Sequence, residues 1–169
     1  SMIANECFNC ADPNIGLSLN EDRTYVKCYM GDTGLLISHT FDENEISDSE
    51  LYREILFGKL SVNEGMFYEN AVAQMLVAAG HKLYFYVRYD ESKHRNDVEI
   101  DFIISNKSKL KYKICPIEVK SKERYSTVSL NKFKTKFSQR IEEIYVIHPK
   151  NFKIEDKTLY LPPYMVFCL

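Results

Sequence analysis

Strand-like patterns dominate the second half of the chain. Residues 82–89 are mostly aromatic or β-branched. In residues 98–105, polar and apolar residues alternate at first, and the segment then becomes continuously apolar. Residues 112–120 and 143–148 have the same character, and residues 158–167 predict an edge strand that prolines break. The pattern therefore predicts a central sheet.

Apolar residues recur with a helical period over residues 61–80. Ser61 has Glu64 at capping-box spacing, and Gly80 suits the helix end. The predicted apolar stripe consists of Val62, Met66, Val72, Ala73, Leu76 and Ala79. Glu69 lies within this stripe, where a buried carboxylate is costly unless another group compensates it. Glu69 is therefore a candidate functional residue.

Shorter elements complete the prediction. Asp32 begins a helix within an Asp-Thr-Gly tripeptide, and the helical pattern after it does not fit an aspartic protease, which needs two such loops with strand flanks. The other predicted elements are a loop with a short strand over residues 1–24, a strand over residues 25–30, and helices over residues 35–39, 48–60 and 129–141. This order predicts an α/β domain with a mixed central sheet flanked by helices.

Strand alternation places acidic residues on two neighbouring strands. Glu118 and Lys120 share one face of their strand. In the preceding strand, Asp101 is predicted on the face opposite to Ile100 and Phe102, which we expect to point together into the core. These acids are therefore candidates to meet at one edge of the sheet.

Glu69, Asp101, Glu118 and Lys120 together have the chemistry of a divalent-metal site. Mg²⁺ binds a few carboxylates and keeps waters for a phosphate ligand, and the lysine can orient an attacking water. The alternative is an acid–lysine ion pair beside ordinary solvent-facing acids, and the spacing leaves both readings open. Like charges held close together should raise the pKa of at least one acid.

Composition narrows the class of protein. The chain has 169 residues, of which 45% are hydrophobic and 27% charged, as is typical of a single globular domain. We expect neither a membrane span nor a signal peptide. Five cysteines are an odd number, so we expect free thiols and a cytoplasmic location. Cys7 and Cys10 have zinc-like spacing, but no second pair completes that site.

Charge is unevenly distributed although the net charge is only −2. Acids outnumber bases in residues 1–60, whereas bases strongly outnumber acids in residues 107–136. Such a basic segment attracts polyanions, or forms an ordinary solvated surface. The candidate DNA-binding residues are Lys122, Arg124, Tyr125, Lys132, Lys134 and Lys136.

Glu69, Asp101 in VEIDFII and Glu118-Val119-Lys120 in PIEVKS form an E…D…ExK series. This series resembles the PD-(D/E)XK nuclease superfamily, in particular its Holliday-junction-resolvase-like branch. Over residues 7–169 the chain is also similar to the C-terminal domain of a family of prokaryotic AAA+ ATPases of unassigned function. That similarity rests on the segments KCYMGDTGLL, GMFYENAVAQML, EIDFII, PIEVKS and LPPYM.

The resemblance implies a restriction-endonuclease-like fold and a role for each matched residue. Asp101, Glu118 and the carbonyl of Val119 would hold Mg²⁺ or Mn²⁺. Lys120 would position or activate the attacking water, and Glu69 would hold a metal-bound water or a second ion. In place of the superfamily's proline, an isoleucine precedes the aspartate, which removes no ligand.

The resemblance also implies a domain order and partners. In the similar ATPases, an ATPase module and a winged helix precede this domain. The chain contains no P-loop motif, so ATP would act only through an ATPase module of a longer protein. We expect residues 1–46 to be the end of the winged-helix region plus a linker, and residues 47–169 to be the nuclease-like domain. DNA is the expected partner; the alternative function is a non-catalytic regulatory or protein-interaction module with a vestigial site.

Overall fold

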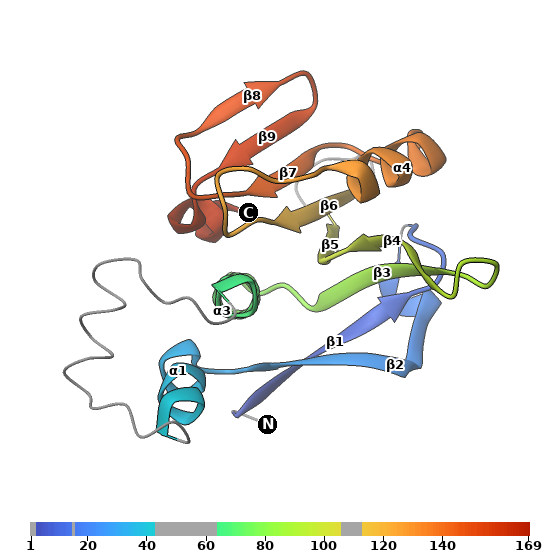
Figure 1. The fold of residues 1–169 in the computed structure, drawn as a ribbon. Coiled ribbons are helices and arrows are strands. Elements are labelled where there is room, and N and C mark those ends of the chain that lie inside the picture. The colour runs from blue at the N-terminus through green and yellow to red at the C-terminus, as the bar shows by residue number, and fades with distance from the viewer. Residues whose placement is uncertain (1–2, 15, 43–63, 106–112) are drawn as a thin grey trace.

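The structure is a computed structural model that describes residues 3–14, 16–42, 64–105 and 113–169. It contains two mixed sheets flanked by helices (Figure 1). The predicted helix over residues 48–60 and the predicted cap at Ser61 lie outside the described residues. The α/β class expected from the sequence is confirmed, but the sequence predicts one central sheet, whereas the described residues form two.

The first sheet has the strand order β2-β1-β3-β4. Its strands are β1 (Ala4–Cys10), β2 (Glu21–Met30), β3 (Leu83–Asp90) and β4 (Arg95–Ile100). β1 pairs antiparallel with β2 and parallel with β3. Residues 1–24 thus contain more strand than the expected loop with one short strand, because pairing with β3 outweighs the turn-forming composition. This sheet joins residues on both sides of the boundary expected at residue 46.

The second sheet has the strand order β5-β6-β7-β9-β8. Its strands are β5 (Phe102–Ser105), β6 (Ile114–Val119), β7 (Ile144–Ile147), β8 (Lys153–Glu155) and β9 (Thr158–Leu161). β6 and β7 are parallel and are connected through α4 (Val128–Phe137), as a parallel crossover requires. The strand expected at residues 158–167 is present as β9, which ends before the prolines and is followed by a 3-10 helix, η2 (Pro163–Cys168). Its expected place at the sheet edge is wrong, because β9 lies between β7 and β8.

A bend at Asp101 separates β4 from β5 and explains why there are two sheets. The sequence pattern predicts one strand over residues 98–105, with Ile100 and Phe102 on the same core-facing side. In the structure Ile100 packs in one hydrophobic cluster with Ile103, whereas Phe102 packs in the other with Ile104. The bend shifts the alternation of side chains, so each face of the segment contributes to a different core.

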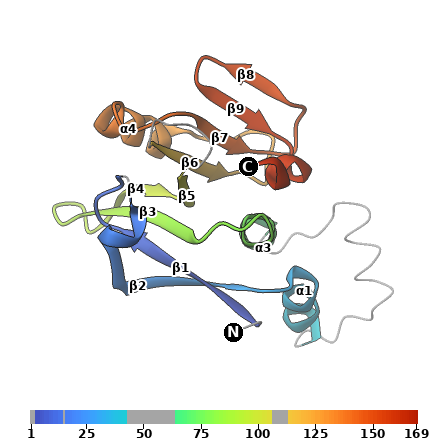
Figure 2. The ribbon, with the colours of Figure 1, turned by 180° about the vertical axis from the view of Figure 1, so that it is seen from behind.

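The helices α1 (Thr33–Asp42) and α3 (Glu64–Ala78) lie beside the first sheet, and α4 also packs on it through Tyr86 of β3 and Asp97 of β4. Figures 1 and 2 show α3 between α1 and η2, beside the start of β3. A short 3-10 helix, η1 (Leu17–Asn20), connects β1 to β2. The predicted apolar stripe of α3 is partly wrong, because Met66 and Ala79 are exposed and Phe67 is buried instead.

Polar contacts fix α3 against the end of β2. The side-chain amide of Asn70 accepts a hydrogen bond from the Met30 N–H at 2.8 Å and donates one to the Met30 carbonyl at 3.1 Å. One turn further along the helix, Gln74 accepts a hydrogen bond from the Thr33 N–H at 3.0 Å. Asp32 caps α1 by accepting a hydrogen bond from the Leu35 N–H at 3.1 Å, as the sequence predicted. The Asp-Thr-Gly segment therefore has a structural role in placing α3.

Candidate acidic site

Glu118 and Lys120 form an ion pair where β6 ends. Lys120 Nζ lies 2.6 Å from Glu118 Oε1, so the two side chains share a face of the strand as expected. Glu118 is only 5% exposed, and its second oxygen, Oε2, is buried with no hydrogen-bond partner among the described residues. A buried carboxylate oxygen without a partner is costly, so this atom is suited to receive a ligand.

Asp101 lies at the bend between β4 and β5 and faces the end of β6. Its Oδ2 accepts a hydrogen bond from the backbone N–H of Val119 at 2.7 Å. Val119 directly follows Glu118, so this hydrogen bond places the Asp101 carboxylate beside the Glu118–Lys120 pair. Its other oxygen, Oδ1, takes no part in this contact.

The acids influence one another electrostatically. Burial raises the pKa of Asp101 to about 8, and the charges of Glu118 and Glu69 add to this shift, while the Val119 N–H and Lys27 oppose it. Burial also raises the pKa of Glu118, against the hydrogen bond and charge of Lys120. The expected rise in the pKa of an acid is present, but its main cause is removal from water rather than repulsion.

Glu69 of α3 faces the first sheet, where two β2 residues contact it. The hydroxyl of Tyr29 donates a short hydrogen bond to Glu69 Oε1, and Lys27 Nζ lies 3.3 Å from the same oxygen. Lys27 also lies 3.0 Å from Oε1 of Glu99 on β4. Burial alone would lower the pKa of Lys27, but the charges of Glu69 and Glu99 outweigh burial and raise it.

Lys27 and Tyr29 are site residues that the sequence reasoning missed. Both lie on β2, two positions apart, so strand alternation puts them on one face. In the sequence they fall within KCYMGDTGLL, one of the segments on which the similarity to the ATPase family rests. A lysine and a tyrosine at strand spacing are a weak signal by themselves. Pairing of β1 with β3, and the docking of α3 on β2, bring them to Glu69.

The predicted set is thus brought together in two connected groups. Lys120, Glu118 and Asp101 lie around the end of β6, and Glu69 lies with Lys27. Among the residues that the structure describes, no three His, Cys, Asp or Glu side chains are close enough to hold a metal ion jointly. The donor chemistry suits Mg²⁺ or Mn²⁺, since Asp101 and Glu118 each have an oxygen outside the contacts above.

The candidate DNA-binding residues fall into separate places. Lys122 and Arg124 are exposed in the segment after β6, beside Lys120. On α4, Lys132 pairs with Asp97 of β4, and Lys136 donates a hydrogen bond to the Tyr86 hydroxyl at 3.1 Å.

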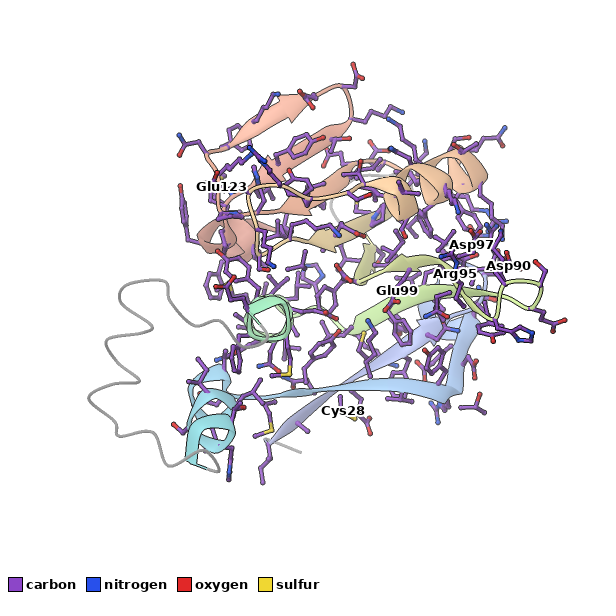
Figure 3. The ribbon with its side chains drawn as sticks, in the orientation of Figure 1. Cys28, Asp90, Arg95, Asp97, Glu99 and Glu123 are labelled. Atoms are coloured by element: carbon purple, nitrogen blue, oxygen red, sulfur yellow. The ribbon has the colours of Figure 1, made fainter. Side chains whose placement is uncertain are left out.

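Lys134 is exposed on α4, and half-buried Tyr125 packs edge-on against buried His148, with ring centroids 6.0 Å apart. Asp97 pairs with Lys132 of α4, and Glu123 lies between Lys122 and Arg124 in the sequence. Figure 3 shows Asp97 and Glu123 well apart. The bases at residues 107–111 lie outside the described residues.

Comparison with known proteins assigns a family. The family model described as "Domain of unknown function (DUF4143)" matches residues 64–164, and the chain belongs to this family. The matched region includes Glu69, Asp101, Glu118 and Lys120 but not β1 or β2. No curated protein and no solved structure matches the chain. None of the described helices has the length and apolar character needed to cross a membrane.

Proposed function

We propose that this chain is a PD-(D/E)XK nuclease-like domain that binds a divalent metal ion and acts on DNA as the C-terminal part of an ATP-dependent protein. In this proposal the DUF4143 family is a restriction-endonuclease-like branch, and the second sheet with its β6–α4–β7 crossover is the nuclease core. Mg²⁺ or Mn²⁺ is the cofactor, and ATP acts only through an ATPase module of the longer protein.

The buried Oε2 of Glu118 is the observation that carries this proposal. It has no hydrogen-bond partner among the described residues, although it lies next to Lys120 and near Asp101. A cation held by Asp101 and Glu118 would satisfy this atom and offset the repulsion between the two acids. The Val119 carbonyl is the third proposed ligand. The bound ion would supply Lewis-acid stabilisation of charge on a phosphodiester.

In this proposal, residues of this chain would hold the ion, position the attacking water and contact the DNA. The Val119 N–H holds Asp101 through Oδ2, which leaves Oδ1 for the ion. Lys120 favours the ionised form of Glu118 through its pairing and has 24% of its side chain exposed, so it can position an attacking water. Lys122 and Arg124 follow within four residues and are exposed, where they would contact the phosphates of DNA.

A second candidate function is a non-catalytic regulatory or protein-interaction module. The observation that favours it is that two acids of the site already have lysine partners: Glu118 pairs with Lys120, and Glu69 pairs with Lys27. Ion pairs of this kind can be kept for structure alone. On this reading the site is vestigial and the chain acts by binding other proteins.

A cleavage assay separates the two functions. Labelled branched and linear DNA would be incubated with the full-length protein, with Mg²⁺ or Mn²⁺ and with or without ATP. The nuclease proposal expects cleavage that requires the metal and is abolished in Asp101→Asn. Asp90→Asn, which changes an acid at the distant end of β3 (Figure 3), is the matched control and should cleave normally. Absence of metal-dependent cleavage on every substrate would favour the regulatory module.

A further inference from the structure

Lys27 lies between two carboxylates that come from different parts of the chain. Its Nζ is 3.3 Å from Glu69 Oε1 on α3 and 3.0 Å from Glu99 Oε1 on β4. Its ammonium group also lies 5.1 Å from the centre of the Phe85 ring, which favours a cation at this position. With 24% of its side chain exposed, Lys27 is a partly buried cation inside the acidic site.

Tyr29 restricts the same carboxylate. Its hydroxyl donates to Glu69 Oε1, the oxygen that Lys27 also contacts. Asn70, the next residue on α3, is fixed to the Met30 backbone, so neither the helix nor the carboxylate can easily turn away from β2. Glu69 is therefore held with one oxygen occupied by β2 residues, and Oε2 takes no part in these contacts.

We propose that Lys27 is a built-in counter-cation of the acidic site, and that a divalent cation bound in this site must displace Lys27 from Glu69 or bind against its charge. The inference rests on the proposed function for the presence of that cation. Lys27 contacts Glu69 and Glu99, and its charge also acts on Asp101, one of the proposed ligands. Its ammonium group and a divalent ion held by Asp101 and Glu118 therefore repel each other, so each weakens the binding of the other. In the absence of metal, Lys27 compensates the charges of Glu69 and Glu99, which also accept hydrogen bonds from the neutral side chains of Tyr29 and Asn96.

In this arrangement Lys27, a residue of the first sheet, influences how tightly an ion binds at the end of β6 in the second sheet. β2 lies outside the region that the family model matches, yet it supplies the charge that sets how tightly the site binds a cation. Any movement of β2 that withdraws Lys27 would raise the affinity for the ion. Tyr29 acts in the same direction as Lys27, because its hydroxyl holds Glu69 Oε1 on β2, beside the Lys27 ammonium group.

Mn²⁺ binding to the whole chain, measured by isothermal titration calorimetry, tests this inference without an activity readout. Lys27→Met keeps the side-chain length over Phe85 and removes the charge, and Lys27→Gln serves if the first variant does not fold. The matched control is Lys82→Met, because Lys82 also pairs with an acid, Glu21, at 2.6 Å and lies over aromatic rings, but outside the site. Lys27→Arg keeps the charge.

The inference expects Lys27→Met to bind Mn²⁺ about fivefold more tightly than the unchanged protein, since partly exposed charge pairs have modest strength. Lys82→Met and Lys27→Arg should bind as the unchanged protein does. Binding by the Lys27→Met variant alone would also support the inference. Equal or weaker affinity in Lys27→Met, with clear binding by the unchanged protein, would overturn the inference and leave the proposed function intact. No binding by any of these proteins would overturn both.

Discussion

The backbone N–H of Val119 donates a hydrogen bond to Oδ2 of Asp101 at 2.7 Å, and this contact connects the end of β6 to the bend where β4 becomes β5. Glu118, the residue before Val119, is thereby kept next to a second buried acid whose pKa is raised. This hydrogen bond, together with the antiparallel pairing of Phe102 with Ile117, keeps the two proposed metal ligands beside each other.

The stability of the metal-free protein should fall as pH rises from about 4 to 8. The pKa of Asp101 is about 8 in the folded protein, above the usual value of about 3.9 for an unfolded chain. Between these values the folded state keeps a proton that the unfolded state has released, so rising pH favours unfolding, with about 1.4 kcal/mol for each unit of the difference. Urea unfolding with a chelator at pH 5 and pH 8 measures this dependence.

Asp101→Asn is the control for that prediction. Asparagine keeps a carbonyl oxygen for the Val119 N–H but cannot ionise. The variant should lose the part of the pH dependence that comes from Asp101, keep the part that comes from Glu118, and be more stable than the unchanged protein at pH 8. An identical slope in both proteins would show that Asp101 does not titrate in this range.

Lys120→Met should destabilise the fold more than Glu118→Gln does. Lys120 lies 2.6 Å from a carboxylate that is 5% exposed, so removing the lysine leaves a buried charge without its partner. The expected cost is about 2 kcal/mol, below the range for fully buried pairs because Lys120 is partly exposed. Glu118→Gln removes the buried charge itself and should cost less. Urea unfolding at pH 7 compares them, and the reverse order would contradict the account.

Tyr29→Phe should lower the free energy of unfolding by about 1 kcal/mol, the usual net value of one hydrogen bond. The substitution removes the hydroxyl that donates to Glu69. Tyr25→Phe is a control on the same strand, because Tyr25 is 46% exposed and packs by its ring edge against Phe85. Thermal unfolding of the two variants should differ; equal effects would show that the hydrogen bond to Glu69 contributes nothing to stability.

DNA binding should depend on salt through the segment after β6. Replacing Lys122 and Arg124 with serine should weaken binding and reduce the log–log salt slope by roughly 0.9 for each phosphate that the variant no longer neutralises. Fluorescence anisotropy with labelled duplex at several salt concentrations measures the slope. The control replaces Lys93, which pairs with Asp90, and Arg95 at the start of β4. Figure 3 shows Asp90 and Arg95 far from Glu123 of the segment after β6. An equal reduction in both variants would indicate a diffuse surface effect.

The second half of the fold could be predicted because its strands carry strong local patterns. The predicted segments 82–89 and 143–148 correspond to β3 and β7, and the helix predicted over residues 61–80 corresponds to α3 where it is described. The bend at Asp101 could not be predicted from the local pattern, in which one strand continues through residue 105. At the bend the Asp101 carboxylate accepts a hydrogen bond from the Val119 N–H, which lies 18 residues further along the chain. Because of this bend, Ile100 and Phe102 pack in different hydrophobic clusters although they lie two positions apart.

The candidate site could be predicted only in part, because some of its contacts join segments that are distant in the sequence. Glu118 and Lys120 lie two positions apart on one strand, so alternation alone places them together. Lys27 reaches Glu69 over a separation of 42 residues, through the pairing of β1 and β2 and the docking of α3. No local pattern records such a contact.

The melting temperature of the whole chain with and without millimolar Mn²⁺ tests the central claim most directly. An ion bound only by the folded state at ten times its Kd should stabilise the protein by about 1.4 kcal/mol, or roughly 3–6 °C for a chain of this size. We expect this increase in the unchanged protein and in Asp90→Asn, and little or none in Asp101→Asn. A melting temperature of the unchanged protein that Mn²⁺ and Mg²⁺ leave the same would contradict the metal site and with it the nuclease proposal.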